Sequence, residues 1–499
     1  MRYNTRYILS LFLMLFLMPT PSFAEDKATL NEIISGFDEE KPSDDALDGL
    51  LKGFKEETGV DEKGRTDDDI LKGFDDESES TKSESPEQEQ KPSIYSLDGY
   101  IKLGASYNIA HDAPGPGKTD WRGLSRLRPE MQLDLSTKFS KSWKAFVSGK
   151  GSYDFAYKIR GRDEFTEPVL DNYEKELELR EAYVLGSLSD SLDIKAGRQI
   201  VVWGKSDNIR VTDILNPLDM REPGLTDIED LRLPVTMTRL DYYIGKLSLS
   251  GIALHEIRFN KNPEYGSDFY PAATPLPLED KPGSWGGNTE FAIAVSGVFS
   301  GWDIAFYWAD IYNDLPHTEL VSNGPPPQIE MKHARLKMYG SAFNMAMGNW
   351  LLKAEAAYFD GMKFFNEPGK THSRTDVLAG IEYSGFKDTT ISLEAVNRHI
   401  NSFNDRLERP PDKANEDEFQ SALRIEKDFL NDTLTFTLLA STFGLTGQDG
   451  TFQRFSVEYD LTDSVKITGG AVLYQSGDLA RHKNIGDNDR IFVEIKYSF

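Results

Sequence analysis

Hydrophobic and polar residues alternate with a period of two over most of the chain after residue 92. The clearest case is the end of the chain, where Ile491, Val493, Ile495, Tyr497 and Phe499 alternate with Arg490, Phe492, Glu494, Lys496 and Ser498. An apolar face opposed to a largely polar face is typical of a β-strand between two environments. The same alternation recurs around residues 127–135, 302–308, 350–356 and 391–395. The pattern therefore predicts a strand-rich region over residues 93–499.

One of the expected strands breaks this rule. Between Leu177 and Val184, Glu181 falls in register with Leu177 and Leu179, on the face that should be apolar. One extra residue in the strand, a β-bulge, would return the following residues to their proper faces. We expect a bulge here; the alternative is that the register of the segment is misread.

Turn-rich connections alternate between short and long along this region. Short ones lie near residues 139–142, 188–191, 244–246, 300–301, 348–349, 385–388, 431–432 and 462–463. Long ones lie near residues 111–120, 159–172, 204–234, 259–286, 313–328, 361–373, 401–416 and 476–487, with a shorter one near 447–450. Short periplasmic turns and long external loops are the asymmetry of outer-membrane barrels. Eight short turns and nine long loops predict an antiparallel transmembrane β-barrel of 18 strands, with 16 as the alternative and both barrel ends in the periplasm.

The last strand supports a membrane barrel over a soluble sheet. Aromatic residues at the last and third-last positions, with a terminal Phe499, are similar to the signal carried by outer-membrane barrels. The alternative is an edge strand of a soluble sandwich. A chain that ends on that Phe argues against this alternative, and the sequence favours an all-β outer-membrane protein.

The first 24 residues have the features of a signal peptide. Arg2 and Arg6 precede an apolar run over residues 8–18, which is followed by Ser22-Phe23-Ala24. A basic start, a short apolar segment and a small-x-small site are typical of a cleaved export signal. A membrane anchor is the alternative, but eleven helical residues cover only about 16 Å, roughly half of a bilayer core. We expect export and cleavage after Ala24.

Residues 25–92 differ sharply in composition from the strand-rich region. They hold 23 Asp and Glu against 9 Lys and Arg. A segment with so much charge and so little apolar surface does not recover the entropy lost on folding. The sequence therefore predicts a disordered acidic tail, which lies in the periplasm if the barrel prediction holds.

Three copies of one short pattern occur inside this tail. Each consists of two aliphatic residues, one polar residue, Gly-Phe and then acidic residues, with the Gly-Phe pairs at Gly36-Phe37, Gly53-Phe54 and Gly73-Phe74. The alternative is a solvated spacer with chance similarity. We interpret the copies as docking motifs for a partner protein, because an aliphatic pair and a Phe suit a groove and linked copies raise avidity.

Composition excludes several classes of function. The 499 residues carry a formal net charge of −26 with a pI of about 4.8, which argues against nucleic acid as a partner. There is no cysteine, so disulfides, thiolate metal sites and cysteine nucleophiles are excluded. The seven histidines show no metal-ligand spacing, and no hydrolase motif is present. We expect no catalytic site, metal or cofactor, with an outer-membrane hydrolase as an alternative.

The most distinctive stretch runs from Gly197 to Glu222 and continues to Pro234. It resembles the signature GRQ…WG…D…R…D…NPLD of a large family of uncharacterised outer-membrane barrels from Gram-negative bacteria, a domain of unknown function. The signature matches well, with Lys205 and Met220 at positions where the family is expected to vary. The resemblance extends from the tail repeats to Phe499. It implies an outer-membrane barrel associated with resistance–nodulation–division type exporters of hydrophobic or lipid-like molecules.

The same stretch is the third long loop and is dense in charge between Pro217, Pro223 and Pro234. Charges at this density are costly to bury unless they are paired. We expect the loop to fold into the barrel lumen, to pair with Arg126, Arg128, Lys353 and Glu355, and to narrow the pore. The candidate constriction residues are Arg198, Gln199, Trp203, Arg210, Asp213, Asn216, Asp219 and Arg221. The alternatives are an external loop whose charges meet water, and Trp203 as a residue of an aromatic girdle.

The leading hypothesis is a non-enzymatic outer-membrane barrel that forms the outer exit, or a docking component, of an envelope transport system. Its expected partners are outer-membrane lipid and periplasmic or inner-membrane transport proteins. A free-standing diffusion porin is the second hypothesis and the hydrolase is the third. The tail separates the first two, because a passive porin needs no docking arm.

Overall fold

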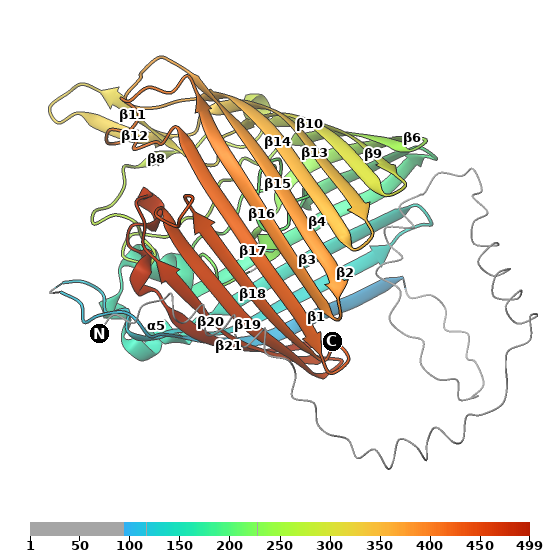
Figure 1. Ribbon diagram of the computed structural model, residues 1–499, viewed down its shortest axis with the longest axis horizontal. Coiled ribbons are helices and arrows are strands. Elements are labelled where there is room, and N and C mark those ends of the chain that lie inside the picture. The colour runs from blue at the N-terminus through green and yellow to red at the C-terminus, as the bar shows by residue number, and fades with distance from the viewer. Residues whose placement is uncertain (1–93, 116, 227) are drawn as a thin grey trace, which may run out of the picture. The chain divides into compact units, whose positions relative to one another are not determined.

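The structure is a computed structural model that describes residues 94–115, 117–226 and 228–499 (Figure 1). The expected signal peptide and acidic tail, including all three Gly-Phe motifs, lie outside the described residues.

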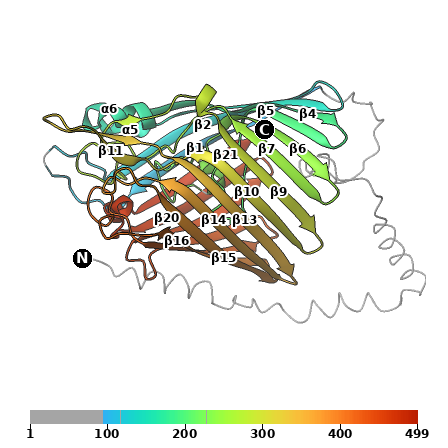
Figure 2. The same ribbon diagram turned by 90° about the horizontal axis from the view of Figure 1, so that it is seen from above.

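Eighteen antiparallel strands form one closed sheet (Figures 1 and 2). β1 pairs with β2 on one side and with the last strand, β21, on the other, so the barrel has no edge. Backbone hydrogen bonds of 3.0 Å join Gly99 and Phe499 in both directions at this seam. The barrel strands are β1 (Tyr95–Asn108), β2 (Gly123–Lys138), β3 (Trp143–Tyr153), β4 (Lys175–Ser189), β5 (Leu192–Gln199), β6 (Val235–Ile244), β7 (Leu247–Leu254), β9 (Glu290–Phe299), β10 (Trp302–Tyr312), β13 (Arg335–Met347), β14 (Trp350–Met362), β15 (His372–Phe386), β16 (Thr389–Asn401), β17 (Asp417–Phe429), β18 (Leu434–Phe443), β19 (Gly450–Thr462), β20 (Val465–Gln475) and β21 (Arg490–Ser498). The prediction of 18 strands is confirmed, and the alternative of 16 is wrong.

Short turns and long loops alternate at the two ends of the barrel, as predicted. The long loops also contain structure that periodicity did not predict. A separate three-stranded sheet forms from β8 (Glu279–Asp280), β11 (His317–Ser322) and β12 (Gln328–Lys332). The helices are α5 (Phe155–Arg160), α6 (Glu167–Val169) and α7 (Ile228–Leu231), with short helical turns at Arg162–Glu164, Leu170–Glu174, Gly286–Asn288, Ala480–His482 and Ile485–Asp487. Within the described ranges, no helix combines the length and the apolar character needed to cross a bilayer.

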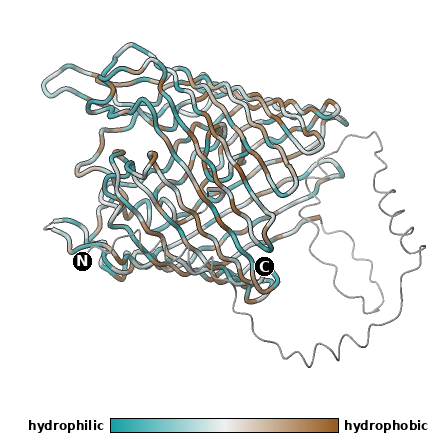
Figure 3. The backbone as a smooth tube through the Cα atoms, viewed as in Figure 1, coloured by the Kyte–Doolittle hydropathy of each residue, from teal (hydrophilic) through white to brown (hydrophobic). Residues whose placement is uncertain are grey.

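Hydrophobic and hydrophilic residues alternate along the barrel strands (Figure 3). The apolar side chains on the outward face are largely exposed. On β21, Ile491, Val493, Ile495 and Tyr497 are each about half exposed, while the intervening Arg490 is buried at 1% exposure. Such exposure would be unfavourable in water but suits a face in contact with lipid.

The irregularity expected near Glu181 is a β-bulge between β3 and β4. Ser148 pairs with Glu181, whereas the next residue, Gly149, pairs with Leu179, so Arg180 is the extra residue. The bulge turns Glu181 toward the lumen together with Glu178, which confirms this prediction.

The inner face of the barrel is not uniformly polar. On one side, buried apolar side chains of five strands form a continuous surface that we call the apolar sector. It consists of Val235 and Met237 on β6, Ile252 and Leu254 on β7, Ala292 and Ala294 on β9, Ala305, Tyr307, Ala309 and Ile311 on β10, and Leu336, Met338 and Ala342 on β13. The inner face of β15, β16 and β17 is instead rich in charged residues, and we call it the charged sector. Its charged members include Arg374, Asp376, Glu382, Glu394, Arg398, Glu418, Arg424 and Glu426.

Candidate functional site

The connection between β5 and β6, residues 200–234, enters the interior of the barrel, and we call it the lumen loop (Figures 1 and 2). Gln199 marks its start, with a fully buried side chain that donates to the carbonyl of Met237 over 3.2 Å. Asn216 ties its two ends together, because its amide nitrogen donates to the carbonyls of Gln199 and Leu233 and its oxygen accepts from the backbone of Val201. Both residues therefore fix the loop where it leaves the wall.

Apolar residues of the lumen loop pack on the apolar sector. The ring of Trp203 stacks on that of Tyr307 with centroids 4.6 Å apart, and Trp203 is only 6% exposed. Ile209, Val211 and Leu215 are buried in the same cluster. Burying these side chains against the wall favours docking of the loop by about 1.5–3 kcal/mol each. Trp203 therefore belongs to the interior of the protein and not to an aromatic girdle.

A buried carboxylate on β14 binds the backbone of the lumen loop. One oxygen of Glu355 accepts from the backbone of Lys205 and Ser206 over 2.6 and 2.8 Å. The other oxygen accepts from the backbone and the hydroxyl of Thr212 over 3.0 and 2.7 Å. Hydrogen bonds to an ionised acceptor are stronger than neutral ones, and removal of the acceptor would leave buried donors unsatisfied. Glu355 is therefore a major anchor of the loop.

A second carboxylate, two strands away from Glu355, extends this anchor. Glu394 on β16 accepts from the backbone of Asp207 and Asn208 and from the hydroxyl of Ser206, all within 2.6–2.9 Å. Lys353 forms an ion pair with the side chain of Asp207. Residues 205–208 are thus bound to the wall by three side chains of β14 and β16.

Within the loop, one carboxylate serves two arginines. Asp213 accepts from Arg232 over 2.9 Å and lies 3.2 Å from Arg210. Arg210 also donates to the carbonyls of Asp213 and Asn216 over 2.6 and 2.7 Å. These contacts hold the loop in a fixed shape rather than binding it to the wall.

The far end of the loop reaches the opposite wall. Glu222 forms an ion pair with Arg126 and lies 3.5 Å from Arg128. Burial by itself would raise the pKa of Glu222, but the nearby guanidinium groups of Arg126, Arg128 and Arg490 lower it to about 2. Glu222 is therefore ionised at any physiological pH. All four wall residues named from the sequence, Arg126, Arg128, Lys353 and Glu355, contact the lumen loop.

Three of the named residues lie away from this interior. Arg198 on β5 donates to Glu256 over 2.5 Å, and Arg221 pairs with Asp219 over 2.5 Å and with Glu176 over 2.9 Å. None of the three lines the cavity described next. They join the loop and its neighbours at the start of β4.

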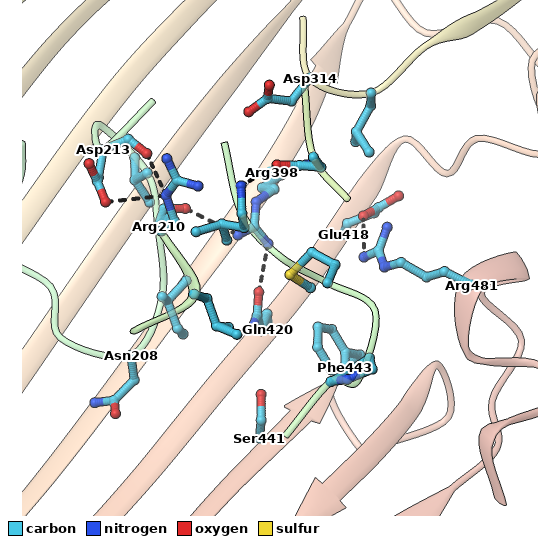
Figure 4. A pocket seen from close by; sticks show the side chains of 18 of the residues that line it. Asn208, Arg210, Asp213, Asp314, Arg398, Glu418, Gln420, Ser441, Phe443 and Arg481 are labelled. Carbon is cyan, nitrogen blue, oxygen red and sulfur yellow. Dashed lines mark hydrogen bonds and ion pairs between the residues drawn. The ribbon is translucent and has the colours of Figure 1, made fainter. Parts of the chain in front are cut away.

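A cavity of about 910 Å³ remains between the lumen loop and the charged sector (Figure 4). Arg210 and Asp213 line it from the loop, and Arg398 and Gln420 line it from the facing strands. Its apolar side reaches the surface at the long-loop end, because Leu276 and Leu315 line the cavity and are 50% and 53% exposed. The arrangement offers a binding space inside the barrel that is open toward that end.

Three residues that matter in this interior were not identified from the sequence. Glu394 and Arg398 lie on the inner face of β16, which the alternation indicates, but no sequence signal shows that the loop crosses the lumen to this strand. Asp314 lies in another long loop and lines the cavity as well. Burial raises the pKa of Asp314 to about 6, although Arg210 and His333 act in the opposite direction.

The hydrolase hypothesis requires a nucleophile and a histidine near the rim. His399 Nδ1 lies 3.0 Å from Asp417 on the outward face. The cross-strand neighbour of His399 is Thr375, whose hydroxyl contacts Asn401 instead. In the part of the chain that the structure describes, no group of three or more His, Asp or Glu side chains is arranged to hold a metal ion.

Comparison with known proteins adds a family and a fold. Residues 117–499 match the family model described as "Protein of unknown function (DUF1302)". Among curated proteins, no sequence matches the chain. The crystal structure of OccAB2 from Acinetobacter baumannii is similar, with a TM-score of 0.50, 10% identity and coverage of 81% of this chain and 98% of that chain. The outer membrane protein OpdK from Pseudomonas aeruginosa has a TM-score of 0.47 at 10% identity, covering 81% and 98%. A BenF-like porin from Pseudomonas fluorescens Pf-5 has a TM-score of 0.49 at 14% identity, covering 81% and 98%.

Proposed function

We propose that this chain, which belongs to the DUF1302 family, is an outer-membrane conduit for hydrophobic or lipid-like molecules and the outer exit or docking component of an envelope transport system. One observation carries the proposal. The lumen loop packs on the apolar sector like part of a protein core and leaves an amphipathic cavity inside the barrel. Large porin barrels usually enclose a polar aqueous channel. A cavity with one apolar side suits molecules that partition poorly into such a channel.

The route through the cavity is tested by plugging it. Because the chain has no cysteine, a single introduced cysteine would be the sole target of a bulky maleimide. Glu418→Cys places it in the cavity lining, whereas Glu458→Cys places it on the inner face of β19 outside that lining. We expect labelling at position 418 to slow transfer of a hydrophobic fluorescent dye across the outer membrane, and labelling at 458 to leave it unchanged.

Two outcomes would overturn the conduit. Equal dye transfer before and after labelling at position 418 would show that the dye does not pass this cavity. Rapid passage of small sugars, with no passage of the dye, would support the free-standing diffusion porin.

The docking role rests on the three tail motifs, which lie outside the described residues. We expect replacement of Phe37, Phe54 and Phe74 by Ala to abolish co-purification of periplasmic or inner-membrane proteins from native envelopes while barrel assembly is retained. Single replacements should weaken capture less, because linked motifs share the binding. The matched control replaces Thr58, Thr66 and Thr81, which lie between or after the motifs, by Ala. Unchanged capture by the triple Phe variant would make the tail a spacer.

A further inference from the structure

The two sides of the cavity differ in chemistry. The lining residues from β15, β16 and β17 are all polar: Arg374, Asp376, Glu382, Thr390, Ser392, Arg398, Glu418, Gln420, Arg424 and Glu426. The lumen loop and the loops before β9 and β13 contribute an apolar side that includes Ile209, Ile214, Met220, Phe269, Leu276 and Leu315. A molecule that fills this space meets charge on one side and hydrocarbon on the other.

Arg398, near the middle of the charged side, has an incomplete set of negative partners (Figure 4). The nearest carboxylate, Asp376, lies 3.8 Å from its Nε. Both oxygens of Asp376 already accept from Arg374, over 2.7 and 2.9 Å. One carboxylate therefore faces two guanidinium groups, and this pair of arginines retains one positive charge.

The other contacts of Arg398 are neutral. Nη1 donates to the side-chain oxygen of Gln420 over 3.0 Å, and Nη2 lies 3.4 Å from the carbonyl of Arg210. Its side chain is only 17% exposed. A guanidinium taken out of water without a matched anion is costly, so an anion that binds there gains much of the missing interaction.

Two other arginines of the same lining, Arg424 and Arg481, each have a carboxylate partner. Arg424 lies 2.9 Å from Glu426, and Arg481 lies 3.3 Å from Glu418. These two pairs provide no excess charge, so Arg424 is a matched control for Arg398.

The contact between Arg398 and the backbone of Arg210 places this charge where the wall meets the loop. Ile209 and Ile214 of the loop and Leu439 of β18 belong to the same apolar cluster and line the same cavity. A charged head at Arg398 would therefore have hydrocarbon surface within reach.

We propose that Arg398 and Gln420 bind the anionic head of an amphiphile, such as a carboxylate or sulfate, whose hydrocarbon part lies against the lumen loop. The inference rests on the proposed conduit function and names its substrate class. Guanidinium and carboxamide groups donate hydrogen bonds that suit an oxyanion. Burial of a long hydrocarbon against the apolar side should make an amphiphile bind more tightly than a bare ion.

The test measures equilibrium binding of radiolabelled decanoate to the full-length protein in nanodiscs, with empty nanodiscs subtracted. We expect decanoate to bind at least tenfold more tightly than decyltrimethylammonium, and affinity to fall roughly fourfold for each methylene removed. Arg398→Gln should weaken decanoate binding at least tenfold, Arg398→Lys should keep most of it, and Arg424→Gln should change it less than twofold.

Other results would overturn the inference. Equal binding of the anionic and cationic amphiphiles, or equal losses in Arg398→Gln and Arg424→Gln, would remove Arg398 as the head site. Acetate that binds as well as decanoate would leave a site for simple anions. Decanoate binding that depends on Arg398, in a protein that transfers no hydrophobic dye, would retain the site and overturn the conduit.

Discussion

The apolar and charged sectors of the inner wall belong to one barrel but have different roles. The apolar sector is covered by Trp203, Ile209 and Val211 of the lumen loop and behaves as a protein core. The charged sector borders the cavity, and its Glu394 and Arg398 hydrogen-bond to the loop. The difference shows that the lumen is divided lengthwise into a packed half and an accessible half. The loop is therefore better described as an internal element of the fold than as a flap over a pore.

The largest expected effect comes from breaking the anchor of the packed half. Glu355→Ala would leave the backbone donors of Lys205, Ser206 and Thr212 without their acceptor, at about 1–3 kcal/mol each. We expect the loop to detach and single-channel conductance in planar bilayers to rise several-fold. Glu458→Ala, at an inner-face side chain that pairs with Lys466 of the next strand, is the control. Conductance that is the same in both variants would contradict the anchor.

A smaller effect, on stability, is expected when truncation of a buried side chain leaves a void in the packed half. Trp203→Ala removes a buried ring stacked on Tyr307 and should cost about 3–5 kcal/mol of stability. The midpoint of heat-induced unfolding, followed by the shift of the barrel band on a gel, should fall. Trp302→Ala, at a side chain that is 39% exposed on the outward face, should lower it less. The reverse order would show that the loop contributes little to the core.

The accessible half should show a moderate dependence on pH. Because burial raises the pKa of Asp314 to about 6, its carboxyl is largely neutral below that pH and ionised above it, although Arg210 and His333 oppose the shift. The negative charge opposes an anion in the cavity, so affinity for decyl sulfate, which stays ionised, should fall about threefold as the pH rises from about 5 to 7. Asp314→Asn should have a flat profile. A profile that persists in the variant would assign the effect to another group.

The smallest effect is expected at the edge between the loop and the wall. Lys205 lies 2.6 Å from Asp303, but the two side chains are 28% and 22% exposed. Partly exposed ion pairs contribute about 0–1 kcal/mol. Lys205→Gln should therefore leave both conductance and the unfolding midpoint close to those of the unmodified protein. A loss as large as that of Trp203→Ala would mean that this pair, and not packing, holds the loop.

The barrel itself could be predicted from the sequence because strand alternation and turn composition are local signals. The bulge at Arg180 could also be predicted, since a single extra residue inverts the pattern on either side of it. The small sheet of β8, β11 and β12 could not, because its strands are short and come from separate loops.

The candidate site could be predicted only in part from the sequence. The density of charge and proline singled out the lumen loop, and the need to pair its charges pointed to Lys353 and Glu355. Glu394 and Arg398 were missed because contacts across a lumen depend on the path of the loop, which no periodicity encodes. Arg198 and Arg221 share the same signature as Arg210, but Arg198 pairs with Glu256 and Arg221 with Glu176 at the start of β4. Neighbours in sequence diverge in space once a loop turns inward.

The shortness of β5 and β7 has a consequence for the surrounding lipid. Each has eight residues, whereas β2 has 16. Tilted strands of eight residues span about 20 Å along the membrane normal, less than the apolar band of about 25 Å typical of such barrels. We expect hydrophobic mismatch to thin the bilayer beside β5, where the lumen loop begins. In thicker membranes a spin label at Val202→Cys should then lie closer to the acyl chains. The thickness of the bilayer would then change the environment of the residues where the lumen loop leaves β5.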